Sequence, residues 1–124
     1  MDRTISLNSE WYFYEGIKKP SVKGGLFKKT VTLPINSSDA FSVVRKIICP
    51  KQVNDTVTVY FDGDFSDMKV YAGKKLLNAF ADENGNTVYD ITAALKTGKT
   101  CLCATVSKGS INGFFLSVKR NYNV

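Results

Sequence analysis

Apolar residues recur at every second position in several stretches of this 124-residue chain. The alternation runs through residues 28–33, 57–61 and 114–118, where it has the period of a half-buried β-strand. Turn-forming residues separate these stretches, among them Asn54-Asp55, Gly63-Asp64, Ala72-Gly73-Lys74, Asn84-Gly85-Asn86 and Asn112-Gly113. Short strands at this spacing predict an all-β fold, a sandwich or a barrel.

One stretch breaks the alternation and predicts one or two helical turns, at residues 90–98. Asp90 or Thr92 would cap its start, and Gly98 suits its end. The chain has no long amphipathic helix, which argues against parallel βαβ folds and the nucleotide sites they carry. Without a repeat, linker or low-complexity tract, residues 1–124 are interpreted as a single domain.

The strand predicted near residues 100–106 is free of charge on both faces. Alternation places Leu102 and Ala104 on one face and Cys101 and Cys103 on the other. Such a strand is either central in a covered sheet or presents one face to another domain. We therefore expect Cys101 and Cys103 to line a face that neighbouring structure covers.

Composition and charge narrow the classes of partner. The net charge is +6, but the lysines are scattered as short pairs, whereas a nucleic-acid-binding face needs clustered cations and stacking rings. Solvated strand edges explain these lysines better, and we predict no nucleic-acid partner. No apolar run approaches the roughly 20 residues that a membrane-spanning helix needs, so no membrane partner is predicted either.

Cysteine usage and the first residues leave the localisation open. The three cysteines are odd in number and lack zinc-type spacing, so free thiols are expected, and these slightly favour the cytoplasm. Residues 1–5 form no apolar signal segment, but a domain cut from a longer protein would lack one as well.

The sequence offers little for catalysis. It contains no histidine, which removes Ser-His-Asp, Cys-His and zinc-hydrolase arrangements. Two acidic groups are candidates for a glycosidase pair: residues 62–67, with three aspartates, and Asp82 with Glu83. Turn chemistry, in which the carboxylate bonds nearby backbone amides, is the simpler interpretation. We predict no catalytic residue.

The acidic segment that begins at Asp62 also has oxygen ligands at alternate positions, as in a calcium loop. An EF-hand is excluded because Asp67 stands where glycine is required and Gly73 where glutamate is required. A calcium site of another kind stays open, but we predict neither a metal ion nor a cofactor.

Candidate sugar contacts lie in two places. In the Trp-Tyr-Phe-Tyr run at residues 11–14, alternation sends Trp11 and Phe13 inward and Tyr12 and Tyr14 outward. Residues 80–86 form a loop that mixes amides and carboxylates beside a ring. The predicted carbohydrate contacts are Tyr12, Tyr14, Asp82, Asn84 and Asn86.

Six short motifs follow one another in an order that is informative as a whole. Residues 7–13 are close to Leu-Asn-Gly-x-Trp-x-Phe, and residues 30–34 to Val-x-Leu-Pro. Residues 44–50 are close to Tyr-Arg-Arg-x-Phe-x-x-Pro, with Val44 in place of Tyr and Arg45 retained.

The second half of the chain continues the series. Residues 57–63 match Val-x-Leu-x-Phe-x-Gly, residues 70–74 match a shortened Val-Tyr-Val-Asn-Gly-Lys, and residues 89–98 are close to Phe-Asp-Ile-Thr-x-x-Leu-x-x-Gly. In this order the chain resembles the sugar-binding, galactose-binding-like domain of family 2 glycoside hydrolases, which include β-galactosidases, β-glucuronidases and β-mannosidases.

The resemblance implies a jelly-roll β-sandwich of two antiparallel sheets. In that family the two catalytic glutamates belong to a (β/α)8 barrel, which these residues do not contain, so no catalytic residue carries over. The matching positions Arg45, Gly63, Gly73, Asp90 and Thr92 look architectural.

The function implied is a non-catalytic accessory domain, cut from a larger glycosidase, with carbohydrate and neighbouring domains as partners. Two alternatives stay open: a stand-alone carbohydrate-binding module, and a protein-interaction jelly roll without sugar binding.

Overall fold

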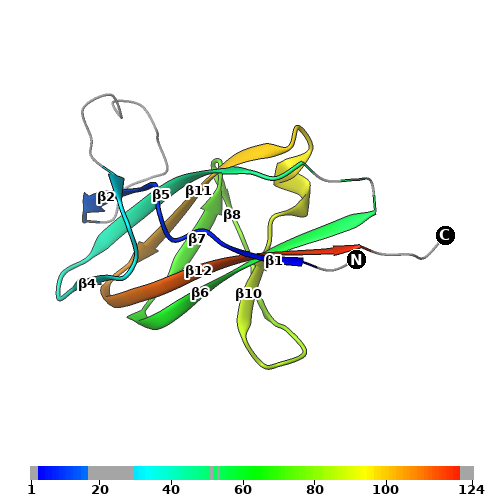
Figure 1. Ribbon diagram of the computed structural model, residues 1–124. Coiled ribbons are helices and arrows are strands. Elements are labelled where there is room, and N and C mark those ends of the chain that lie inside the picture. The colour runs from blue at the N-terminus through cyan, green and yellow to red at the C-terminus, as the bar shows by residue number, and fades with distance from the viewer. Residues whose placement is uncertain (1–2, 17–29, 51, 53, 121–124) are drawn as a thin grey trace.

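The fold is a sandwich of two antiparallel sheets (Figure 1). The computed structural model describes residues 3–16, 30–50, 52 and 54–120. Within them, sheet A contains β1 (Arg3–Ser6), β12 (Lys108–Arg120), β6 (Asp55–Ser66), β10 (Thr87–Asp90) and β9 (Ala79–Ala81), in this order, with β4 (Ile35–Ser37) beside β12. Sheet B contains β3 (Thr30–Val31), β2 (Trp11–Glu15), β5 (Phe41–Ile48), β11 (Lys99–Val106), β7 (Lys69–Ala72) and β8 (Lys75–Leu76).

The predicted fold class is therefore confirmed. The alternating stretches at 57–61 and 114–118 lie in β6 and β12, which pair over most of their length. Of the stretch at 28–33, Thr30–Val31 form β3, and residues 28 and 29 lie outside the described residues.

Aromatic rings from both sheets meet at the centre of the core. Trp11 is fully buried, and its ring centroid lies 5.1 Å from that of Phe114 and 5.9 Å from that of Phe61. Its indole Nε1–H donates to the carbonyl of Leu7 at 2.9 Å, which satisfies the one polar atom of the ring. Phe13 stacks on buried Phe41, so both inward predictions in the 11–14 run are confirmed.

The long β6–β12 pair depends on a glycine. Gly63 lies opposite Ile111, just before a register shift in β12. A Cβ built on Gly63 would collide with the carbonyl oxygen of Ser110, so only glycine lets the two strands approach this closely. The architectural role predicted for Gly63 thus has a steric basis.

The predicted helical turn is present as a 3-10 helix, η2 (Thr92–Leu95). Its cap is shifted from the prediction, because Ile91 occupies the N-cap and makes no side-chain cap. Asp90, one residue earlier, accepts the N–H of Thr92 at 2.8 Å, and Thr92 Oγ1 accepts the N–H of Val57 at 2.9 Å. The turn is therefore fastened to β6 through Thr92.

In the described part of the chain, no helix has the length and apolar character that crossing a bilayer requires.

Candidate functional site

The predicted sugar contacts lie on different sheets. Tyr12 and Tyr14 are on β2 of sheet B, while Asp82, Asn84 and Asn86 are in the loop that joins β9 to β10 in sheet A. Each group borders a surface hollow of its own. The predicted sugar contacts therefore divide between two candidate sites.

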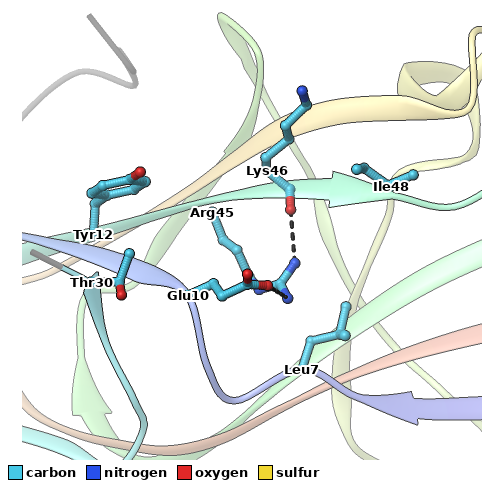
Figure 2. A pocket seen from close by; sticks show the side chains of 7 residues that line it. All are labelled: Leu7, Glu10, Tyr12, Thr30, Arg45, Lys46 and Ile48. Atoms are coloured by element: carbon cyan, nitrogen blue, oxygen red, sulfur yellow. Dashed lines mark hydrogen bonds and ion pairs between the residues drawn. The ribbon is translucent and has the colours of Figure 1, made fainter. Parts of the chain in front are cut away.

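The first hollow, here called the Arg45 pocket, has a volume of about 430 Å³ (Figure 2). It lies beside β2 and β5 and is lined by Leu7, Glu10, Tyr12, Thr30, Arg45, Lys46 and Ile48. Figure 2 shows the Arg45 side chain reaching toward Glu10 and the backbone of Lys46.

The guanidinium of Arg45 is occupied by groups of the protein itself. Its Nε donates to the Ser9 carbonyl at 2.8 Å, and its Nη1 donates to the Lys46 carbonyl at 2.8 Å. Its Nη2 forms an ion pair with Glu10 Oε2 at 3.0 Å. With 11% of its side chain exposed, Arg45 ties the 7–10 segment to β5. Its role is structural, as the sequence predicted.

The two tyrosines of β2 face away from the core, as alternation predicted. Tyr12 pairs with Val44 and Tyr14 with Ser42, and both are only half-exposed. The hydroxyl oxygen of Tyr14 is buried, so this tip does not face solvent. Tyr12 lies at the rim of the Arg45 pocket, and sugar contact by these two residues stays a prediction.

The second hollow, here called the sheet A groove, has a volume of about 470 Å³. It runs over the outer side of sheet A between the β9–β10 loop and the strands β6, β12 and β1. Its side chains include hydroxyls, one ring and charges of both signs: Arg3, Thr4, Thr56, Thr58, Phe80, Asp82, Glu83, Asn84, Ser117 and Lys119.

A row of hydroxyl groups crosses three strands on the floor of this groove. Ser117 pairs with Thr58 on one side and with Thr4 on the other, and Thr4 Oγ1 lies 3.3 Å from Ser117 Oγ. The alternate residues Val57 and Val118 point into the core. Thr4 and Ser117, which are 113 positions apart in the sequence, thus belong to one polar row on the outer face of sheet A.

Aromatic residues flank the hydroxyl row on the same face. Phe80, 45% exposed, lies opposite buried Val88 at the edge of the groove. Beside the groove, the rings of Tyr60 and Phe115 stack with centroids 6.2 Å apart. Phe114 and Phe115 are neighbours in sequence, yet the side chain of Phe114 is buried in the core and that of Phe115 lies half-exposed on the outer face.

The carboxylates near this face have local partners. Asp82 Oδ1 accepts the N–H groups of Asn84 and Asn86, both at 2.9 Å, as expected of a turn-forming aspartate. Burial raises the pKa of Tyr60, and the Asp62 carboxylate, 3.4 Å from its hydroxyl, and the charge of Asp82 raise it further. Asp82 and Asn84 line the groove, whereas the side chain of Asn86 is exposed in the loop.

The sequence did not single out Thr4, Thr58, Ser117 or Tyr60 as site residues. The available signal was the outward set of positions in the alternating stretches of β6 and β12. That signal locates a face but does not show which strands lie side by side.

The thiols are poorly suited to nucleophilic chemistry. Burial, aided by neighbouring Cys101, raises the pKa of Cys103 to about 12, and burial also raises the pKa of Cys101. Cys103 is fully buried between Val44 and Tyr71 on adjacent strands, whereas Cys101 is half-buried. The expectation of a covered face is met at Cys103 within this chain.

Metal ligands do not gather in the described residues, where no group of three or more His, Cys, Asp or Glu side chains could hold an ion. The buried carboxylate of Asp55 instead pairs with Arg120 at 3.2 Å and accepts the N–H of Gln52 at 2.9 Å. This arrangement closes the end of the β6–β12 pair.

Comparison with known proteins gives a consistent picture of the fold. No protein-family model matches the sequence, and no curated protein matches it either. Solved structures do match: an FMN-binding beta-glucuronidase from Facaelibacterium prausnitzii L2-6 aligns with TM-score 0.71 and 21% identity, over 98% of this chain and 23% of that one. Beta-glucuronidase 2 of Bacteroides uniformis aligns with TM-score 0.79 and 16% identity, over 98% of this chain and 18% of that one.

A third match is a glycosyl hydrolase family 2 member from Bacteroides cellulosilyticus DSM 14838, with TM-score 0.73 and 16% identity, over 95% of this chain and 21% of that one. At these identities the likeness shows the fold. The chain spans about a fifth of the length of the enzymes it matches.

Proposed function

We propose that this chain is the non-catalytic β-sandwich domain of a family 2-like glycoside hydrolase, whose catalytic barrel lies outside these residues. The observation that carries the proposal is the unequal coverage: the match takes in 98% of this chain but 18% of the Bacteroides uniformis enzyme. The order of the six sequence motifs supports the same assignment independently. The proposed partners of this chain are the neighbouring domains of its own parent glycoside hydrolase, together with carbohydrate.

Three aspartates of the chain take part in structural contacts, which agrees with a non-catalytic role for them. A glycosidase needs one acid and one base or nucleophile at a fixed separation. Here Asp55 is paired with Arg120, Asp82 organises its own loop, and Asp90 bonds the start of η2. Each of these aspartates has a structural task.

The proposal is tested by reading the gene on both sides of residues 1–124 and assaying its product. We expect the reading frame to continue into a (β/α)8 barrel that carries two glutamates. We also expect the full-length protein, but not the isolated chain, to hydrolyse aryl β-glycosides. An isolated reading frame, or turnover by the chain alone, would overturn the proposal.

A stand-alone carbohydrate-binding module is the second candidate. The sheet A groove favours it, because an exposed ring beside a row of hydroxyls gives this domain a polar hollow of its own. The gene sequence separates the two candidates, since a module that acts alone needs no barrel in its reading frame.

A further inference from the structure

We propose that the sheet A groove binds a neutral glycan, with one pyranose ring against Phe80 and its hydroxyls toward the row formed by Thr4, Thr58 and Ser117. The inference deepens the proposed function and rests on it only for the expectation that the ligand is a carbohydrate. It adds the hydroxyls of the strand face to the β9–β10 loop, which the sequence had indicated and whose Asp82 and Asn84 also line the groove, and it leaves out the tyrosines of β2.

The ring supplies the apolar contact. Among the described residues, Phe80 is the one aromatic side chain in the group of large, strongly exposed hydrophobics, which otherwise holds Ile5, Ile48 and Leu76. Val88 lies opposite it on β10 and is 95% removed from solvent, so the ring is backed by packed structure. Ligand sites commonly combine such an apolar wall with a few placed polar groups.

The hydroxyl row supplies the polar contacts. Each hydroxyl can donate once and accept twice, the same capacity that sugar hydroxyls have. The bond between Thr4 and Ser117 uses one donor and one acceptor of the pair, which leaves both oxygens able to bond a ligand. Ser117 sits between Thr58 and Thr4 on neighbouring strands, so the row follows a direction across the sheet.

The charges favour an uncharged ligand. Arg3 on β1 and Lys119 on β12 supply two cations to the groove, while Asp82 and Glu83 on the β9–β10 loop supply two anions. A ligand of one charge sign would meet a like charge within the groove, and like-charge contact opposes binding. A polyhydroxyl ligand without net charge meets no such opposition.

The neighbouring aromatic pair extends the surface. Tyr60 and Phe115 stack with an angle of 23° between ring planes, on the face that also carries Thr58 and Ser117. From Phe80 on β9 to Phe115 on β12 there are three strand steps, or about 14 Å at about 4.8 Å per step. This length suits a short oligosaccharide better than a single sugar.

The test is an NMR titration of the ¹⁵N-labelled chain with β-linked gluco-, galacto- and manno-oligosaccharides of three or four units. We expect saturable shifts for at least one of them, centred on the amides of Thr58, Phe80 and Ser117. Shifts centred on Tyr12 and Tyr14, or no saturable shift up to roughly 50 mM sugar, would overturn the proposal.

Two variants sharpen the result. Phe80→Ala is expected to weaken binding at least tenfold. Leu76→Ala changes a residue on β8 of sheet B that is 51% exposed, against 45% for Phe80, and should leave binding within twofold. Thr58→Val keeps the side-chain shape and should weaken binding about fivefold. Folding of each variant is checked from its amide spectrum, and unchanged binding by folded Phe80→Ala would refute the assignment.

A titration with an oligogalacturonide, which is an anion, tests the charge argument. If it binds more tightly than every neutral glycan, the proposal that the ligand is neutral is wrong. Failure here is distinct from failure of the proposed function. If the reading frame continues into a barrel but the chain binds no glycan, the groove proposal fails and the accessory-domain proposal stands. If the chain binds a glycan but the reading frame contains no barrel, the accessory-domain proposal fails and the groove proposal stands.

Discussion

The outer faces of the two sheets differ in how far their outward-pointing side chains are buried. On sheet B, Ser42, Val44, Cys103 and Thr105 are almost fully buried, although alternation points them away from the core. On sheet A, the equivalent positions carry half-exposed hydroxyls and rings, with Phe80 at 45% exposure.

The two hollows show the same contrast at the level of single groups. The Arg45 pocket contains a guanidinium, the more conspicuous binding group, yet this group is bonded to two carbonyls and a carboxylate of the protein. The sheet A groove has weaker groups that retain bonding capacity. A charged side chain in a hollow is therefore a poor guide to ligand binding until its internal partners have been counted.

The largest expected effect separates the inner and outer sides of β12. Phe114 is fully buried against Trp11 and Phe61, so Phe114→Ala should lower the free energy of unfolding by about 4 kcal/mol. Phe115→Ala removes a half-exposed ring stacked on Tyr60 and should cost about 1 kcal/mol. Urea unfolding measures both, and equal losses would show that the outer face of sheet A is part of the core after all.

The next effect tests whether the Arg45 pocket is structural. Arg45→Met leaves the carbonyls of Ser9 and Lys46 without their donor and should cost about 3 kcal/mol. Glu10→Gln is the control, because its side chain is 75% exposed and its ion pair should contribute less than about 1 kcal/mol. A small effect of Arg45→Met in urea unfolding would mean that the guanidinium is available to a ligand.

The sequence predicted those features that depend on local period. Alternation identified β6 and β12, and it oriented Trp11 and Phe13 correctly, because the pleat fixes which side chains share a face. The helical turn was also found, but its cap was misplaced by one residue. Thr92 bonds across to Val57 on β6, and a contact over 35 positions leaves no mark in the local pattern.

The candidate site was harder to predict for the same reason. Thr4, Thr58 and Ser117 are ordinary outward polar residues in their own strands, and only the register of β1, β12 and β6 brings them together. The β9–β10 loop was recognisable from its composition, and two of its predicted residues, Asp82 and Asn84, do line the groove. Their neighbours across the sheet could not be deduced without the strand order.

The smallest expected effect concerns the ionisation of Tyr60 on the outer face of sheet A. Its pKa is raised above the usual 10.0, so the folded protein favours the protonated phenol. The resulting stability is fully present below pH 10 and is lost as the pH rises through the folded-state pKa. Burial raises the pKa of Tyr89 as well, and its contribution has the same sign.

The matched comparison is therefore urea unfolding of wild type and Tyr60→Phe at pH 8 and pH 11. Tyr89 and the cysteines ionise in both proteins. The difference between the two proteins in how much unfolding free energy they lose from pH 8 to pH 11 therefore reports Tyr60 alone. We expect Tyr60→Phe to lose less stability over this interval than wild type does. Equal losses would mean that neither burial nor the carboxylates of Asp62 and Asp82 raise the pKa of the Tyr60 phenol in the folded protein.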